Sequence, residues 1–328
     1  MDLSRAQIKE LIRGALSWEE DESGMIPLRF TAKQMAEIAR SEHFIRYSRT
    51  STGIRLACET DAAHLEAEFS VFPGSTRGLW GFDLYADDTL ISHSEGLVSE
   101  CSEVHLSYDI PAGSHTINLY FPVLTGAKIK RISLSGATFA RPVKLPLLIC
   151  FGDSITNGFY VHFPSLSYPG ILARKLGRDL INFGIAGYTF HPDLVDPDLT
   201  GMADLIFTVL GTNDWTAKDL PAAKADAQEF YKRVVRIASG AKIFALTPIW
   251  RADCAKTVQM GISFESWRSI LSDIASGIPE IRTIDGASIF PEITELFDDH
   301  VAHPNDIGNI LFAEKLLSMP AINELAGC

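Results

Sequence analysis

The sequence predicts an α/β domain with a mostly parallel sheet, preceded by a β-sandwich domain. Three observations support this prediction. The chain has 328 residues, which is longer than the chains that usually fold around a single hydrophobic core. Its first part contains short apolar runs that alternate with polar residues, and its second part alternates continuous apolar runs with helical stretches. We therefore expect two domains, at residues 1–143 and 144–328.

The first domain is expected to consist of strands after a short helical lead. Residues 4–19 place apolar side chains at helical spacing, which predicts a helix there. Several short segments with a period of two follow, as is typical of a β-sandwich. The predicted strands lie at residues 53–58, 65–71, 104–108, 116–121 and 130–134, and further apolar positions at Phe82, Leu84 and Leu90 lie on either side of a turn signal at Asp87-Asp88.

The second domain contains continuous apolar runs, as expected for parallel strands that are covered on both faces. Helical stretches at residues 221–239 and 264–276 lie among them. Ligands of such sheets bind at the carboxyl ends of the strands, so functional residues are expected just after each run. The predicted strands are residues 147–151, 179–183, 205–210 and 242–246.

Composition excludes several functional classes. With 29 Lys and Arg against 41 Asp and Glu, the net charge of −12 argues against nucleic-acid or anionic-membrane partners. No apolar stretch approaches the roughly 18 residues of a membrane helix, and no signal peptide is visible. Five widely spaced cysteines predict reduced thiols and a cytoplasmic location. They are Cys58, Cys101, Cys150, Cys254 and Cys328.

Three short segments follow the first three apolar runs of the second domain. Ser154, in Gly152-Asp-Ser, follows the first run and is either a nucleophile or a helix N-cap. Gly187 follows the second run, where a glycine lets its N–H approach a ligand closely, and an ordinary strand-to-loop turn is the alternative. Asn213 follows the third run and is either an oxyanion donor or part of a turn.

A fourth segment near the end of the chain contains His303, with acidic residues before it and Pro304 after it. A histidine in such a loop can act as a base towards a nucleophile, and a neighbouring acid can orient its imidazole. A metal site formed by His300, His303 and an aspartate is the alternative. No further cluster of His or Cys completes its coordination shell, so we expect no metal and no cofactor.

Together, the four segments resemble the sequence blocks of the SGNH (GDSL-type) hydrolases, which are esterases and acyltransferases. The resemblance covers about residues 145–320 and implies a flavodoxin-like, three-layer α/β/α domain. The stretch Gly81-Phe-Asp-Leu-Tyr85 resembles the Gly-x-Asp-Leu-Tyr signature of a β domain that precedes some of these esterases. Here the resemblance implies a jelly-roll-like sandwich.

The resemblance also implies roles for single residues. Ser154 is the expected nucleophile, and His303 acts as general base and then as general acid. The backbone N–H groups of Ser154 and Gly187 and the side chain of Asn213 are the expected oxyanion donors. Asp153 is similar to an aspartate that braces the turn in the family.

The last block departs from the Asp-x-x-His pattern of the family, because His300 stands three residues before His303. A one-residue insertion lets Asp299 orient the histidine, and this is the assignment that we favour. Asp298 or a backbone carbonyl group is the alternative.

Four residues near the predicted strand ends are candidates for substrate binding. They are Tyr188, Trp215, Trp250 and Arg251. Aromatic walls with one cation suit a sugar or an aromatic ester. Core packing is the alternative for the aromatic residues, and pairing with Asp253 is the alternative for Arg251.

Three functions compete at this point. We favour a serine esterase without metal or cofactor, acting on short-acyl esters, preferably acetyl esters of a carbohydrate or a related small alcohol. An acyltransferase that uses the same site is the second, and a carbohydrate-binding protein with an inactive hydrolase domain is the third. The expected partner is a small-molecule ester, with an acylated sugar as one candidate. Homo-oligomerisation through the β domain stays open.

Overall fold

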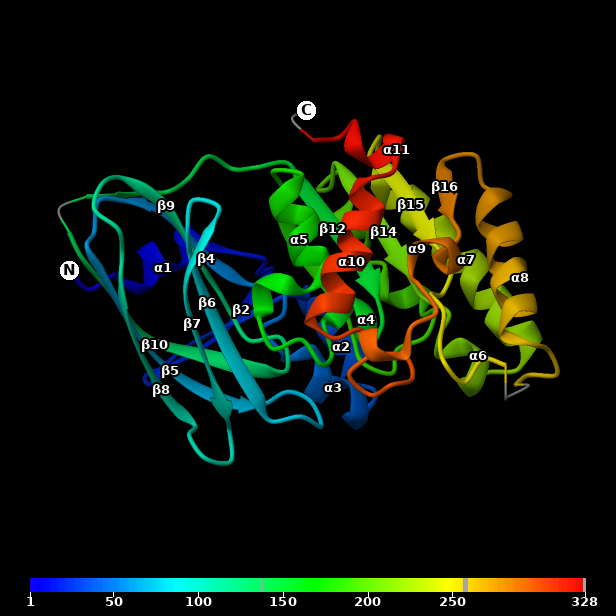
Figure 1. The fold of residues 1–328 in the computed structure, drawn as a ribbon, viewed down its shortest axis with the longest axis horizontal. Helices are drawn as coiled ribbons and strands as arrows, with labels where there is room; N and C mark the ends of the chain where they lie inside the picture. Colours follow the sequence, from blue (N-terminus) through cyan, green and yellow to red (C-terminus); the bar gives the residue numbers. More distant parts are fainter. Residues whose placement is uncertain (137, 256–258, 327–328) are drawn as a thin grey trace.

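A computed structural model describes residues 1–136, 138–255 and 259–326. The first half of the chain forms two antiparallel sheets, and the second half forms a parallel sheet with helices around it (Figure 1). No helix among the described residues is long and apolar enough to cross a membrane. Four cysteines are free thiols, and Cys328 lies outside the described residues.

The two antiparallel sheets share one hydrophobic core. Alternate residues such as Leu56 and Phe82 of one sheet and Phe69 and Ile129 of the other are buried in the same cluster. The two sheets that we expected are thus confirmed, whereas a jelly-roll-like course of the chain stays a prediction. One sheet contains β1 (Ile12–Arg13), β4 (Arg55–Thr60), β6 (Leu79–Ala86), β7 (Thr89–Leu97), β9 (His115–Tyr120) and β11 (Phe139–Ala140). The other contains β2 (Ser17–Asp21), β3 (Gly24–Leu28), β5 (His64–Pro73), β8 (Glu103–Asp109) and β10 (Thr125–Ser135).

The helical lead is shorter than the sequence predicted. Helix α1 (Arg5–Leu11) ends before Gly14, and the following residues enter strands instead. Gly14 has a φ of +86°, and a Cβ atom there would lie 2.4 Å from the carbonyl oxygen of Gly53. The backbone is already extended at Ile12, and the left-handed Gly14 then lets the chain pass close to Gly53.

Two helices in the first half were not predicted. They are α2 (Ala32–Ile38) and α3 (Glu42–Ser48), each only seven residues long. Ile38 and Tyr47 on these helices are buried in a core cluster of the parallel-sheet half. The chain before residue 144 therefore completes the core of the second half, although a boundary near 143 stays a prediction.

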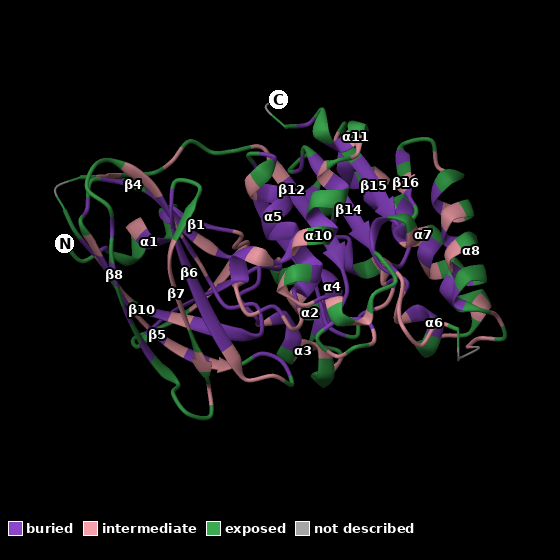
Figure 2. Cartoon of the chain, in the orientation of Figure 1, coloured by how far each residue is buried: buried purple, intermediate pink, exposed green. Residues whose placement is uncertain are grey.

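The second half is a five-stranded parallel sheet in the order β13-β12-β14-β15-β16, which in chain order is 2-1-3-4-5. Figure 2 shows these strands buried along most of their length. Along β12, Ile149 and Phe151 pack into one core cluster, whereas Leu148 and Cys150 pack into another. Apolar layers on both faces confirm the expected α/β sheet. Its strands are β12 (Leu147–Gly152), β13 (Asp179–Gly184), β14 (Leu205–Val209), β15 (Lys242–Leu246) and β16 (Ile281–Ile284).

Helices cover both faces of this sheet. Buried residues of α7 and α8 join one core cluster, and those of α5 and α10 join the other. The two long predicted helices are confirmed as α7 and α8. The helices of this half are α4 (Ser154–Asn157), α5 (Tyr168–Lys175), α6 (Asp214–Ala217), α7 (Leu220–Ala238), α8 (Phe264–Ser276), α9 (Gly286–Ile289), α10 (Asp306–Leu317) and α11 (Pro320–Asn323). Short 3-10 turns lie at Pro164–Leu166, Pro192–Leu194, Pro197–Leu199 and Thr294–Leu296.

A buried arginine connects the N-terminal half to strand β13 of the parallel sheet. Arg29 is fully buried, and its guanidinium donates to the backbone carbonyls of Asn182 (2.6 Å), Tyr47 (3.0 Å) and Thr50 (3.1 Å). Burial lowers the pKa of Arg29 to about 9. Because each of these bonds would leave a buried group unpaired if broken, Arg29 fixes β13 against the N-terminal half.

The Gly-x-Asp-Leu-Tyr stretch of β6 forms a second junction. Gly81, Asp83 and Tyr85 alternate with core residues and face the loop that follows α4. Asp83 accepts a hydrogen bond from the Ser165 N–H (2.8 Å), and Tyr85 Oη lies 3.2 Å from Ser165 Oγ. A Cβ atom at Gly81 would lie 2.7 Å from the carbonyl oxygen of His162. The motif therefore docks the antiparallel sheet onto this loop.

Candidate functional site

Ser154 is the first residue of α4, directly after β12. The N-cap of this helix is Asp153, which accepts the N–H of Ile155 at 2.9 Å. The Ser154 hydroxyl is therefore not needed as a cap, and its Oγ lies 2.8 Å from Nε2 of His303. The structure thus favours the nucleophile over the cap for Ser154.

Two glycines allow the tight turn around Ser154, for different reasons. A Cβ atom at Gly152 would lie 1.9 Å from Oγ1 of Thr156, so this position requires a residue without a side chain. Gly158 ends α4 with a φ of +84°, a left-handed conformation that glycine adopts without strain.

His303 lies between Ser154 and Asp299. Its Nδ1 is 2.5 Å from Oδ2 of Asp299, while Oδ1 of the same carboxylate accepts the N–H groups of Val301 and Ala302 at 2.9 Å. Burial acts to raise the pKa of Asp299, but hydrogen bonds from the His303 ring and the loop N–H groups outweigh it, so the pKa is lowered. The ionised carboxylate holds the imidazole in one orientation.

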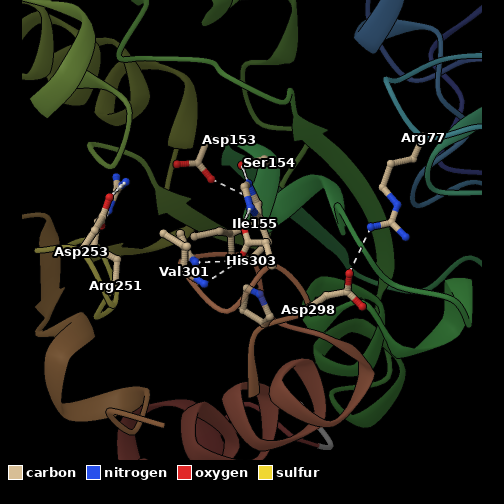
Figure 3. Close-up of polar contacts among 12 residues, drawn as sticks. Arg77, Asp153, Ser154, Ile155, Arg251, Asp253, Asp298, Val301 and His303 are labelled. Carbon is tan, nitrogen blue, oxygen red and sulfur yellow. Dashed lines mark hydrogen bonds and ion pairs between the residues drawn. The ribbon is translucent and has the colours of Figure 1, made fainter. Parts of the chain in front are cut away.

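Asp298 points to the other side of the same loop. Its carboxylate pairs with Arg77 of the N-terminal half at 3.1 Å (Figure 3). Of the three groups that could orient His303, the geometry therefore selects Asp299. His300 has a φ of +56°, a left-handed residue within the turn that brings Asp299 back to His303.

The loops that follow β13 and β14 are tied together near Ser154. Gly187 is exposed with a φ of +77°, and Asn213 Nδ2 donates to the carbonyl of Tyr188 at 2.8 Å. Within the part of the chain that the structure describes, the N–H groups of Ser154 and Gly187 have no hydrogen-bond acceptor. These two N–H groups and the second amide N–H of Asn213 are available to a ligand.

Two aspartates in the motif segments are buried, Asp153 next to Ser154 and Asp214 next to Asn213. Burial raises the pKa of Asp153 and of Asp214 to about 6 each. Asp214 accepts the N–H of Phe190 at 3.1 Å and pairs with Lys218. By contrast, Oδ2 of Asp153 has no hydrogen-bond partner among the described residues. Asp153 caps α4 and does not contact His303, as expected for a residue that braces the turn.

The four candidate substrate-binding residues differ in their surroundings. Trp215 and Tyr188 are only 1% and 5% exposed and belong to the core of the parallel-sheet half. The ring of Trp250 stacks on Phe297 at 5.7 Å, and Arg251 pairs with Asp253 through two nitrogens at 2.5 and 2.8 Å (Figure 3). Contact with a substrate stays a prediction for all four.

Several residues at the site were missed by the sequence analysis. The rings of Phe159 and Tyr160 lie 5.3 and 5.4 Å from the ring of His303. On the other side, a Cβ atom at Gly187 would lie 3.7 Å from the side chains of His43 and Phe44. The two aromatic residues next to the Gly-Asp-Ser segment offered a weak signal, whereas nothing in the sequence links α3 to Gly187.

Metal ligands do not gather at the histidine loop. Among the described residues, one group of three side chains could hold an ion, formed by Glu37, His191 and Asp193. Glu37 pairs with Arg40 and Asp193 pairs with Arg233, so both carboxylates are already neutralised. The alternative site at His300 and His303 does not form, because His303 faces Ser154 and Asp299.

A cavity of about 340 Å³ lies between the two halves, near the amino end of β13, whereas Ser154 follows the carboxyl end of β12. Its lining includes Arg13, Arg55 and Asp179, which form ion pairs of 3.6 and 2.6 Å. Neither Ser154 nor His303 lines it. The junction of the two halves thus contains a cavity, but this cavity is separate from the hydroxyl–imidazole pair.

Comparison with known proteins agrees with this geometry. Residues 150–310 match the GDSL-like lipase/acylhydrolase family. No curated protein sequence matches the chain. A salicylyl-acyltransferase from a tetracycline biosynthetic pathway has a similar structure, with a TM-score of 0.80 and 20% identity over 95% of this chain and 94% of that one.

Two further solved structures share the fold of both halves. A Bacteroides ovatus protein described as a GDSL-like lipase has a TM-score of 0.74 and 16% identity, over 97% of this chain and 96% of that one. A family two carbohydrate esterase from Clostridium thermocellum, in complex with cellohexaose, has a TM-score of 0.64 and 15% identity, over 96% and 99%. Residues 150–310 therefore form a domain that matches the GDSL-like lipase/acylhydrolase family, and the chain is an ester-hydrolysing enzyme.

Proposed function

We propose that the protein is a serine esterase that removes short acyl groups, preferably acetyl, from a carbohydrate or a related small alcohol. The observation that carries this proposal is the continuous chain of contacts from Ser154 Oγ through the ring of His303 to the carboxylate of Asp299, at 2.8 and 2.5 Å. A hydroxyl, an imidazole and a carboxylate in this order form the arrangement of serine hydrolases.

The first half-reaction transfers the acyl group to the enzyme. Ser154 Oγ attacks the ester carbonyl carbon while its proton passes to Nε2 of His303, and Asp299 stabilises the resulting imidazolium. The negative charge that develops on the carbonyl oxygen accepts hydrogen bonds from the N–H groups of Ser154 and Gly187 and from Asn213. When the carbon–oxygen bond to the alcohol breaks, His303 returns the proton to the departing alcohol.

The second half-reaction releases the acid. A water molecule gives its proton to His303 and attacks the acyl carbon, and the bond to Ser154 Oγ then breaks as the serine regains its proton. Deacylation uses the same oxyanion donors, since its tetrahedral intermediate carries its charge on the same oxygen. No group outside the described residues is needed for this sequence of proton transfers.

Preference for a carbohydrate ester is supported by the solved structures with the same two-part fold. Among them, the Clostridium thermocellum protein is described as a carbohydrate esterase and was solved with cellohexaose. Another, from Cellvibrio japonicus, is also a family two carbohydrate esterase. The aromatic rings of Phe159 and Tyr160 beside His303 offer apolar surface to a sugar ring or an acyl group.

Acyl transfer to an alcohol is a second candidate function. The salicylyl-acyltransferase with a TM-score of 0.80 favours it, because the two halves of this chain align with it over 95% of their length. Both functions share the acyl-enzyme, and they differ only in whether water or an alcohol attacks it. Product analysis with an added acceptor alcohol separates the two functions. A transferase forms more acylated acceptor than free acid, whereas a hydrolase forms mainly the free acid.

The experiment that tests the proposal is hydrolysis of p-nitrophenyl esters, from acetyl to octanoyl, and of an acetylated sugar. We expect turnover that decreases with acyl length and is lost in Ser154→Ala. As a control, Ser48→Ala removes another buried hydroxyl, which donates to the carbonyl of Ile45 at 2.8 Å. Unchanged turnover in Ser154→Ala would refute the proposed mechanism.

A further inference from the structure

Arg77 connects the antiparallel-sheet half to the histidine loop. It lies between β5 and β6 and reaches Asp298, 221 residues later in the chain, with Nη1 3.1 Å from Oδ2 (Figure 3). The two side chains are 30% and 33% exposed, so water screens the pair only in part. Asp298 is the neighbour of Asp299, which orients His303.

The same guanidinium also covers an aromatic ring beside the histidine. Cζ of Arg77 lies 3.9 Å from the centre of the Tyr160 ring, and this ring lies 5.4 Å from that of His303. Arginine is suited to this geometry because its planar cation stacks on an aromatic face while its edge donates to a carboxylate. One side chain thus contacts the two segments that flank His303.

Both segments need support to keep their conformation. Tyr160 has a φ of +80°, which is unfavourable for a residue with a bulky side chain and persists only where neighbouring contacts hold it. In the histidine loop, the N–H of Asp298 donates to the carbonyl of His303 at 3.0 Å. A displacement of Asp298 therefore moves the backbone of His303 directly.

We propose that Arg77 is a positioning residue for His303, supplied by the N-terminal half of the chain. It holds the Asp298 carboxylate away from the imidazole and presses Tyr160 against the loop, so that Nε2 stays within reach of Ser154 Oγ. This inference rests on the proposed function, in which His303 transfers the proton. Because Arg77 touches the neighbours of His303 and not the reacting atoms, its removal lowers kcat and leaves the affinity for a small ester nearly unchanged.

The test is a double-mutant cycle with Arg77→Met and Asp298→Asn, measured with p-nitrophenyl acetate. Small displacements of a catalytic group cost up to about 100-fold in rate. We expect each single variant to lower kcat by about 10-fold with KM changed less than about 2-fold. The double variant should be no slower than the slower single variant, because both changes remove the same contact. Arg77→Lys keeps the charge but loses the planar stack, and we expect it to recover only part of the rate.

A matched control distinguishes positioning from general stability. Arg49 pairs with Glu19 at 2.6 Å, has a side-chain exposure of 31% and lies over the ring of Phe72 at 5.6 Å. Arg49→Met removes the same kind of contact, made to Glu19 and Phe72 and not to the histidine loop. It should lower the thermal midpoint about as much as Arg77→Met and leave kcat unchanged.

Three outcomes would overturn the inference: a kcat for Arg77→Met equal to that of Arg49→Met, additive losses in the double variant, or a loss confined to KM. If Arg77→Met does not fold, the isosteric Asp298→Asn alone decides, since it removes the charge pair without removing a stacked side chain. A failure of the proposed function is recognised by a different result: Ser154→Ala would then hydrolyse the ester as fast as the wild type does.

Discussion

Asp298 and Asp299 are neighbours in the sequence, and their carboxylates face opposite sides of one loop. Asp299 lies 2.5 Å from Nδ1 of His303, whereas Asp298 lies 3.1 Å from Nη1 of Arg77. One acid therefore belongs to the proton-transfer chain and the other to the contact between the two halves of the protein. Two residues of equal chemistry thus have separate effects that substitution can measure.

Replacement of these two acids should lower kcat unequally. Asp299→Asn removes the charge that stabilises the imidazolium and orients the ring, so we expect a loss of about 1000-fold or more in kcat. Asp298→Asn removes only a half-exposed ion pair, and about 10-fold is expected. Steady-state kinetics with p-nitrophenyl acetate measures both. Small and equal losses would refute the assignment of Asp299.

Asn213→Ala should lower kcat/KM by about 100- to 1000-fold, because the side-chain amide is an oxyanion donor in the proposed mechanism. The variant also removes the bond from Nδ2 to the carbonyl of Tyr188. Asn323→Ala, on α11 far from Ser154, is the control and should retain full activity. If Asn213→Ala keeps more than about half of the wild-type rate, the amide is not an oxyanion donor.

Gly152→Ala should be far more harmful than Gly177→Ala. A Cβ atom at Gly152 would overlap Oγ1 and Cβ of Thr156 at 1.9 and 2.3 Å, so α4 and Ser154 must move. Gly177 has a φ of +60° but nothing within 4 Å, so only conformational strain of about 1 kcal/mol is expected there. Urea unfolding and esterase assays compare the two variants. Equal losses in both variants would show that the contact with Thr156 costs no more than the backbone strain at Gly177.

Titration of Asp153 should make stability depend on pH. Burial raises its pKa from 3.8 to about 6, so the folded protein holds the proton more tightly than the unfolded chain. The associated stabilisation is fully present below pH 3.8 and is lost as the pH rises through about 6. Asp153→Asn cannot titrate. Relative to this variant, the free energy of unfolding of the wild type should therefore fall by on the order of 3 kcal/mol across that range.

Urea unfolding of both proteins at about pH 4 and about pH 7 measures this difference. Asp214 also has a raised pKa and interacts electrostatically with Asp153, so the comparison reports the titration of Asp153 together with its coupling to Asp214. A difference that is the same at both pH values would contradict a raised pKa of Asp153.

Sequence patterns predicted the strands and helices correctly where their conformation depends on residues nearby in the chain. The strands β12 to β15 are continuous apolar runs because they are covered on both faces, and this burial is visible in the sequence. By contrast, β16 has two adjacent polar residues, Arg282 and Thr283, between Ile281 and Ile284. This partly exposed strand at the sheet edge was missed. Helices α2 and α3 were missed because seven residues carry too little periodicity.

The residues of the site were likewise predictable only where they stand in short sequence motifs. Ser154 and His303 stand in recognisable blocks, and the structure brings their side chains together. Arg77 and Tyr160 carry no motif, since their roles depend on a contact between loops that are far apart in the sequence. Such contacts follow from how the two halves pack, which short-range patterns do not specify.

The buried contacts of Arg29 and of helices α2 and α3 determine where this enzyme can be cut and joined to another protein. A cut at residue 143 would remove Phe30, Ile38 and Tyr47 from the core of the hydrolase half and would leave the carbonyl of Asn182 without its donor. An exchange of one sandwich for another from a related gene would cause the same damage unless residues 29–53 remained behind. Chimaeras that keep the hydrolase core intact therefore need their breakpoints inside the N-terminal half.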